Sequence, residues 1–166
     1  SGMGVALGIY ATEFAQVLAQ SPLGLSVYAA TGSALSIASG RVSFALGLHG
    51  PCASFETACS ASLVACHTAM RALQQAECST HLVGGVNLML LQASSVGMAI
   101  AGMTSVLGRC HTFDSRADGF VRGEGCSATV ISAAEAVQAV ALRGSAVRQD
   151  GRSASLTAPS GQAQQG

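Results

Sequence analysis

Residues 53–75 read ASFETACSASLVACHTAMRALQQ, and this stretch decides the fold. Residues 53–56 form a short strand-like run, and apolar residues then recur at helical spacing over residues 63–73. Only residues 57–62 lie between the two patterns, so the chain has room for no more than a sharp turn and the start of a helix. The stretch therefore predicts a strand, a sharp turn and a helix, with Cys59 in the first turn of the helix.

The same alternation of strands and helices continues on both sides of this unit. Strands are expected at residues 4–10, 82–91, 126–132 and 140–147. Helices are expected at residues 13–19 and 94–101, and over residues 35–46 with Ser33 as the N-cap. Residues 102–125 are rich in loop-forming types. Continuous apolar strands that alternate with helices are typical of an α/β fold whose sheet is covered on both faces.

The composition limits the classes of function. The chain has 166 residues, 49% of them hydrophobic and 10% charged, which suits one domain with a large buried core. All eight basic residues are arginine and they balance eight acidic ones, so no electrostatic footprint for nucleic acid is present. The absence of lysine excludes a P-loop, a protein-kinase site and a pyridoxal Schiff base within these residues. So apolar a chain with so few charges indicates a fragment, an oligomer or both.

The six cysteines contain no CxxC pair, which argues against a disulfide scaffold and against structural zinc. Most of these thiols are expected to be small buried apolar residues. Residues 78–108 carry no charge, but glycines and polar residues divide them into a short strand and a helix, so no membrane span is predicted. The first residues also lack the pattern of a signal peptide.

Cys59 is the candidate with the clearest chemistry. A thiol in the first turn of a helix meets unpaired N–H groups and the positive end of the helix dipole, which favour the thiolate. The turn also lies at the carboxyl edge of the sheet, where α/β proteins place their ligands, and the N–H of Cys59 can help to hold an oxyanion. Cys59 is thus a candidate nucleophile for acyl transfer, and a buried structural thiol is the alternative.

A cysteine nucleophile usually needs a base. His67 follows Cys59 by eight residues, which corresponds to about 12 Å along a helix axis, too far for a hydrogen bond. His49, His81 and His111 lie at element edges or in a charged loop and are not evident partners. A conventional Cys-His pair is therefore not predicted within this chain.

Residues 55–67, FETACSASLVACH, resemble the active-site signature of β-ketoacyl synthases, specifically the ketosynthase domains of modular or type I polyketide synthases. Further blocks resemble the same family in the same order: GGVN at 84–87, AGM at 101–103, GRCHTFD at 108–114, ADGFVRGEG at 117–125, RGSAVRQDG at 143–151 and LTAP at 156–159. Ordered blocks along nearly the whole chain are far more specific than one short motif.

The resemblance implies a thiolase-like layered α/β/α fold, with residues 1–166 as a partial β-ketoacyl synthase domain, mainly its N-terminal half and truncated at both ends. It implies that Cys59 accepts an acyl group as a thioester for decarboxylative condensation with a malonyl-type extender. The substrates would be phosphopantetheine-linked on acyl carrier protein, with no cofactor bound directly. A homodimer, further synthase domains and a cytoplasmic location are also implied. The two family histidines would lie beyond residues 156–159.

Two alternatives stay open, namely a fatty-acid β-ketoacyl synthase and a catalytically silent dimerisation or carrier-docking module. The chain departs from the family pattern at Glu56, where Asp is usual, and at Ala61, where Ser is common. Glu124 is either a carboxylate close to the site or the partner of Arg122 or Arg116 in a structural ion pair. The loop blocks fit thiolases and chalcone synthases less well.

Overall fold

A computed structural model describes residues 2–10, 13–133, 140–155 and 157–165. Contacts between residues divide the chain into two compact units, residues 1–134 and residues 135–166. The first unit contains a sheet of four strands, β1 (Met3–Tyr10), β2 (Cys52–Phe55), β3 (Thr80–Asn87) and β4 (Gly125–Ser132).

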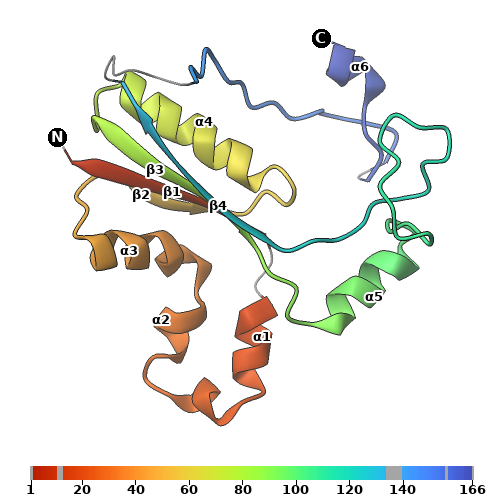
Figure 1. Cartoon of the computed structure of the whole chain (residues 1–166), viewed down its shortest axis with the longest axis horizontal. Coiled ribbons are helices and arrows are strands. Elements are labelled where there is room, and N and C mark those ends of the chain that lie inside the picture. The colour runs from red at the N-terminus through yellow and green to blue at the C-terminus, as the bar shows by residue number, and fades with distance from the viewer. Residues whose placement is uncertain (1, 11–12, 134–139, 156, 166) are drawn as a thin grey trace. The chain divides into compact units, whose positions relative to one another are not determined.

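The strand order is β2-β1-β3-β4 (Figure 1). β1 pairs in parallel with both β2 and β3, and β4 runs antiparallel to β3. The predicted α/β fold is therefore confirmed. The carboxyl ends of the parallel strands meet at one edge, where Tyr10 is paired with Asn87 and Asn87 with Gly125.

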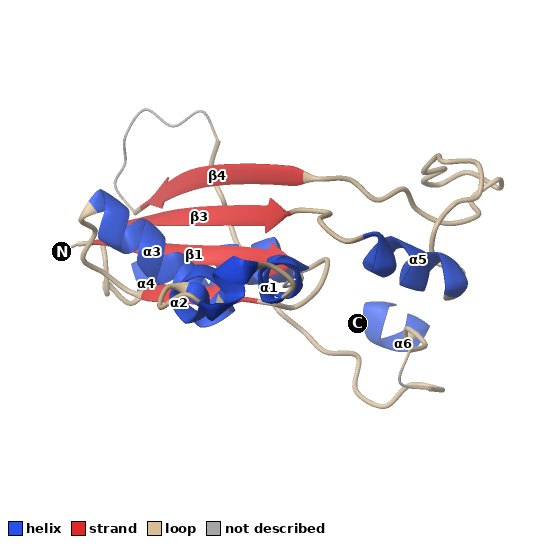
Figure 2. Ribbon diagram, turned by 90° about the horizontal axis from the view of Figure 1, so that it is seen from below, coloured by secondary structure: helices blue, strands red, loops and turns tan. Residues whose placement is uncertain are grey.

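Helices lie on opposite faces of this sheet (Figures 1 and 2). On one face, Ala65 and Ala69 of α4 (Ala61–Gln74) pack with Ala6 and Val83 in the buried core. On the other face, α3 (Leu35–Leu46) is tied to β2 by hydrogen bonds between Ser39 and Ser54. β4 is exposed along nearly its whole length, so the prediction of helices on both faces holds around β1 and β2 but not at β4.

The contact between α4 and the sheet is very close. The buried face of α4 is a stripe of alanines, Ala61, Ala65, Ala69 and Ala72, whereas the larger Leu63 is 75% exposed. A Cβ atom on Gly8 would overlap the backbone nitrogen of Ser62, and one on Gly85 would overlap the Ser62 hydroxyl. Gly8 is therefore needed for the first turn of α4 to lie directly on the strands, whereas a side chain at Gly85 would require the Ser62 hydroxyl to turn away.

The remaining helices of this unit are α1 (Glu13–Ala19), the 3-10 turn η1 (Pro22–Leu25), α2 (Ala29–Ser33) and α5 (Gln92–Ile100). α1 has the predicted bounds. The prediction that Ser33 caps α3 is wrong, because Ser33 ends α2 and its hydroxyl donates to the Ala29 carbonyl at 2.8 Å. A serine that bonds the carbonyl four residues earlier within its own helix is not available as the N-cap of the next one.

Residues 88–91 do not continue β3 as the sequence predicted. The N–H groups of Leu90 and Leu91 donate to Glu13 instead of to a neighbouring strand, at 2.6 and 2.7 Å. The strand therefore ends at Asn87, and the chain turns into α5.

Within its described residues, the second unit has a short helix, α6 (Gly161–Gln165), and a loop in which the Asp150 carboxylate accepts the N–H of Ser160 at 2.8 Å. The strand predicted at residues 140–147 is wrong, since these residues form no strand. Their apolar side chains are exposed, with Val140 at 86%, and a strand needs a paired neighbour that the described residues do not provide. Within the described parts of both units, no helix is long and apolar enough to cross a membrane.

Replacing Gly8 by Ala should lower the free energy of unfolding by about 1 to 3 kcal/mol, because the new methyl group collides with backbone rather than with a flexible side chain. Gly40→Ala is the matched control, since that glycine lies inside α3 with open space around it, and it should raise stability by about 0.5 to 1 kcal/mol. Chemical denaturation measures both. Equal effects of the two substitutions would contradict the close approach of α4.

Candidate active site

Cys59 lies in the turn between β2 and α4. Ala58 has a left-handed backbone (φ 53°), and the N–H groups of Ser60 and Ala61 donate to the carbonyls of Thr57 and Ala58 at 3.2 and 3.1 Å. Ser60 is the N-cap, so Cys59 stands just before the helix rather than in its first turn, where the sequence predicted it. The tight turn leaves the Cys59 side chain exposed.

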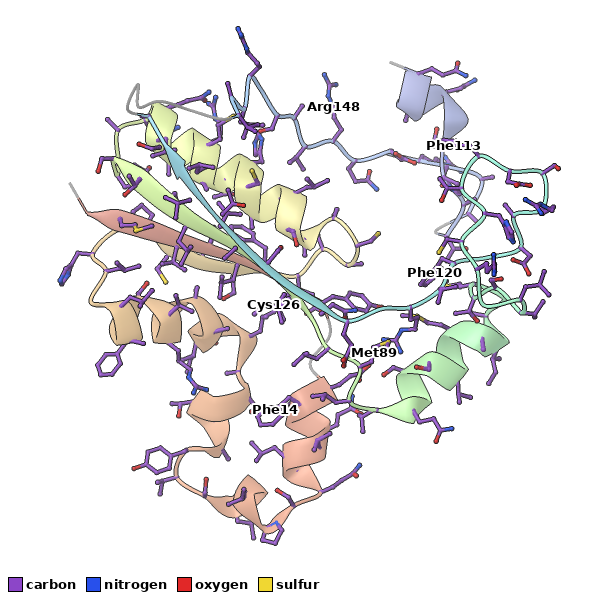
Figure 3. All side chains as sticks on the ribbon, viewed as in Figure 1. Phe14, Met89, Phe113, Phe120, Cys126 and Arg148 are labelled. Atoms are coloured by element: carbon purple, nitrogen blue, oxygen red, sulfur yellow. The ribbon has the colours of Figure 1, made fainter. Side chains whose placement is uncertain are left out.

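A cavity of about 860 Å³ opens at this edge of the sheet, and Cys59 is one of its lining residues. Its floor comes from the ends of β1 and β3 at Tyr10 and Asn87, and from Ser62 on α4. The other walls come from α5, the loop after it and the segment leading into β4, through Met98, Met103, Phe120, Val121, Arg122, Gly123 and Cys126. Figure 3 shows Phe120 on this segment, shortly before Cys126 at the start of β4. Apart from Asn87 and Arg122, most of the lining is apolar or small.

No histidine is among the described residues that line the cavity. His67 is partly buried on α4, and His81 is 2% exposed within β3, where burial lowers the pKa of its ring, opposed by the Leu82 carbonyl and by Glu77. His111 lies 4.0 Å from Asp114 in the loop. The described residues therefore offer Cys59 no imidazole partner.

A buried ion pair joins two segments around the cavity. Glu13 at the start of α1 is 4% exposed, and one of its carboxylate oxygens lies 3.5 Å from a guanidinium nitrogen of Arg122, whose side chain is 8% exposed. Arg122 also donates to the Ser95 hydroxyl on α5 at 2.6 Å. Nearby, the side-chain amide of Asn87 donates a hydrogen bond to the Gly123 carbonyl.

Of the two sequence-based alternatives for Glu124, the structure supports a carboxylate close to the site, because its neighbours Gly123 and Gly125 both line the cavity. Its carboxylate accepts the backbone N–H of Met89 at 2.8 Å. Arg122 pairs with Glu13 instead, and Arg116 pairs with Asp114 at 2.6 Å. Glu124 thus holds the turn after β3 and forms no ion pair with the arginines proposed for it.

The prediction that most cysteines are buried is wrong. Cys78 is buried and Cys66 is intermediate, whereas Cys52, Cys59, Cys110 and Cys126 are exposed as free thiols. The cause lies in their positions, because Cys126 is on the exposed strand β4 and Cys110 is in the loop segment. Across the described residues, no group of three or more His, Cys, Asp or Glu side chains could hold a metal ion.

Sequence reasoning found Cys59 but missed Glu13, and it did not place Arg122 or Asn87 in a site. One signal was present, since Glu13 is the only charged residue among the first 40. A lone carboxylate in so apolar a stretch must be solvated at the surface or find a partner in the interior. The sequence gives no indication of which segment supplies that partner.

The parallel strands, the helix packed on them and the exposed thiol in the turn at their carboxyl edge form an α/β fold with a candidate nucleophile beside a cavity, and solved thiolase-like ketosynthase domains share this fold. The ketosynthase from module 6 of the bacillaene synthase of Bacillus subtilis matches with a TM-score of 0.69 and 41% identity, over 78% of this chain and 21% of that one. The oxazolomycin ketosynthase domain of Streptomyces albus matches with a TM-score of 0.68 and 29% identity, over 78% and 23%.

The family model for the β-ketoacyl synthase N-terminal domain matches residues 1–136, and the chain belongs to this family. It is 44% identical over 166 residues to a phenolphthiocerol/phthiocerol polyketide synthase of Mycobacterium tuberculosis. It is 41% identical over 172 residues to a mycocerosic acid synthase-like polyketide synthase of Mycolicibacterium smegmatis. These alignments cover 96% and 99% of this chain, but only 11% and 8% of the relatives' lengths.

Stability should depend on pH through Glu13. A hydrogen bond with the Ser94 side chain, the N–H groups of Leu91 and Leu90 and the charge of Arg122 hold the pKa of this carboxyl below its ordinary value of 4.5, although burial acts in the opposite direction. A lowered pKa stabilises the fold above the ordinary value, and this contribution is lost as the pH falls through the folded-state pKa.

Glu13→Gln should therefore cost about 3 kcal/mol at neutral pH, because it leaves Arg122 buried without a counter-charge. The unfolding free energy of the variant should fall less steeply than that of the wild type between about pH 6 and pH 3. Denaturation curves at several pH values measure this difference, and parallel pH profiles would contradict the buried pair.

Proposed function

We propose that this chain is the nucleophile-bearing part of a ketosynthase domain in a polyketide synthase, and that Cys59 is its acyl-accepting residue. The observation that carries the proposal is an exposed thiol directly before α4, opening on a cavity of about 860 Å³ at the carboxyl edge of the sheet. Membership of the β-ketoacyl synthase family supports this chemistry. The similarity to polyketide synthases favours a polyketide over a fatty-acid pathway.

In the first step, the Cys59 thiolate attacks the carbonyl carbon of an acyl thioester carried on phosphopantetheine. A carbon–sulfur bond to Cys59 forms, and the carrier thiol leaves and takes up a proton. Cys59 lies directly before Ser60, the N-cap of the 14-residue helix α4, and so beside the positive end of the helix dipole. The N–H groups of Ser60 and Ala61 are used within the turn, so we assign the oxyanion contact available here to the N–H of Cys59.

In the second step, a malonyl-type extender on acyl carrier protein loses carbon dioxide. The electron pair of the broken bond remains on carbon and attacks the Cys59 thioester, the Cys59 sulfur leaves, and a β-ketoacyl thioester remains on the carrier. This step needs groups that stabilise the carbanion, and no histidine is among the described residues lining the cavity. We assign them to histidines outside these residues.

The proposal includes acyl carrier protein as partner, further synthase domains in the parent chain, a cytoplasmic location and no cofactor bound directly. It also includes a homodimer. β2 stands at the edge of the sheet with β1 on its other side, and its first residue, Cys52, is exposed. An unpaired strand edge of this kind can pair with the same strand of a second copy.

Cys59 should be the most rapidly alkylated of the six thiols in the full synthase under native conditions. Cys126 is the matched control, because it is exposed and lines the same cavity but lies on a strand, without a helix N-terminus. Because Cys59 lies beside a helix N-terminus, it should react about tenfold faster than Cys126 with iodoacetamide. Mass spectrometry of timed digests measures the rates, and equal labelling of Cys59 and Cys126 would overturn the assignment of the nucleophile.

Residues 1–166 alone should not form a β-ketoacyl product, because the described residues bring no histidine to the cavity. The full synthase should form the product, and Cys59→Ala should abolish it. Detection of the product by mass spectrometry separates condensation from simple acylation of the thiol. Condensation by the isolated residues that depends on Cys59 would refute the assignment of the second step to groups elsewhere.

A further inference from the structure

Glu13 is buried and takes no part in the acyl-transfer or condensation step proposed above. One carboxylate oxygen accepts the N–H groups of Leu90 and Leu91 at 2.6 and 2.7 Å. Leu91 is the N-cap of α5, so the carboxylate of α1 caps a helix 78 residues further along the chain. The negative charge lies at the positive end of the α5 dipole, which fixes where α5 begins.

The other carboxylate oxygen faces Arg122 at 3.5 Å, and Arg122 donates to Ser95 on α5 at 2.6 Å. The ion pair and this hydrogen bond therefore connect three segments, namely α1, α5 and the chain leading into β4. Two of these segments supply apolar side chains that line the Cys59 cavity. Met98 comes from α5, and Phe120 and Val121 come from the chain leading into β4. Glu13 does not line the cavity itself, so any effect on a bound acyl group must pass through Arg122 and α5.

Burial of such a pair is a poor source of stability, because two charges lose their hydration. Its better attested use is to select one arrangement of segments over others. Here the selected arrangement is the one that holds the apolar wall around Cys59.

We propose that Glu13 is a positioning residue that fixes the acyl-binding wall of the Cys59 cavity and thereby sets which apolar acyl groups Cys59 accepts. This inference rests on the proposed function of Cys59. Short acyl groups fill little of the cavity and depend little on its wall. Long acyl groups contact Met98, Phe120 and Val121, so their acylation rate depends on where Glu13 holds these residues.

The test uses the full synthase and measures acylation of Cys59 by propionyl and octanoyl N-acetylcysteamine thioesters in single turnovers. In Glu13→Gln, the ratio of the octanoyl to the propionyl second-order acylation rate constant should fall about tenfold, a typical size for a change in apolar pocket contacts. Iodoacetamide is too small to depend on the apolar residues that line the cavity, so alkylation of Cys59 should stay at the wild-type rate. Glu13→Asp keeps the charge and should restore part of the ratio. Glu77→Gln, an exposed glutamate just after α4, is the matched control and should change nothing.

A purely structural role would lower both acylation rates and the alkylation rate together and leave the ratio unchanged, and that result would overturn the inference. Should Glu13→Gln fail to fold, Ser95→Ala removes only the second anchor of Arg122 and should lower the same ratio about threefold. An unchanged ratio in Ser95→Ala would also count against the inference. Failure of the proposed function is distinguishable, since wild-type Cys59 would then be neither acylated nor preferentially alkylated.

Discussion

The close approach of α4 to the sheet is the constraint on which the site depends. Gly8 and Gly85 leave no side chain between the strands and the first turn of the helix, and alanines form the rest of the contact. Each buried methyl group contributes only about 0.8 kcal/mol, so this interface relies on fit rather than on large apolar side chains. Because these small residues let the first turn of the helix lie directly on the strands, the turn before it places Cys59 close to the carboxyl edge.

The wall of the cavity is held by a different kind of interaction. Glu13 accepts two backbone N–H groups at the start of α5 and faces the guanidinium of Arg122. A buried carboxylate that lost one of these partners would be left with an uncompensated charge, so the three segments that meet at Glu13 stay together or separate at considerable cost. Apolar packing therefore places the nucleophile, and a buried charge places the surface around it.

The sequence predicted the features that depend on neighbours along the chain. The strand, turn and helix around Cys59 and the bounds of α1 follow from local patterns, and the structure contains them. The errors concern features that depend on distant residues. Residues 140–147 have the composition of a strand but no paired strand among the described residues. Residues 88–91 leave the sheet because Glu13, far away in sequence, accepts the N–H groups of Leu90 and Leu91. The buried face of α4 was equally hidden, since its alanines carry less hydrophobic signal than the exposed Leu63.

The side chains that line the cavity can change without moving the backbone around Cys59. Met98, Met103 and Phe120 line a cavity whose surrounding backbone is fixed by Glu13 and by the hydrogen bond from Asn87 to Gly123. Methionine side chains are flexible and polarizable and adapt to irregular shapes. Substitutions among the lining residues can therefore reshape the space for an acyl chain while the backbone stays in place. Cys59, which is held by the contact of α4 with Gly8 and Gly85, keeps its position through such changes. The reacting thiol and the surface that selects its substrate are thus positioned by separate interactions within one fold.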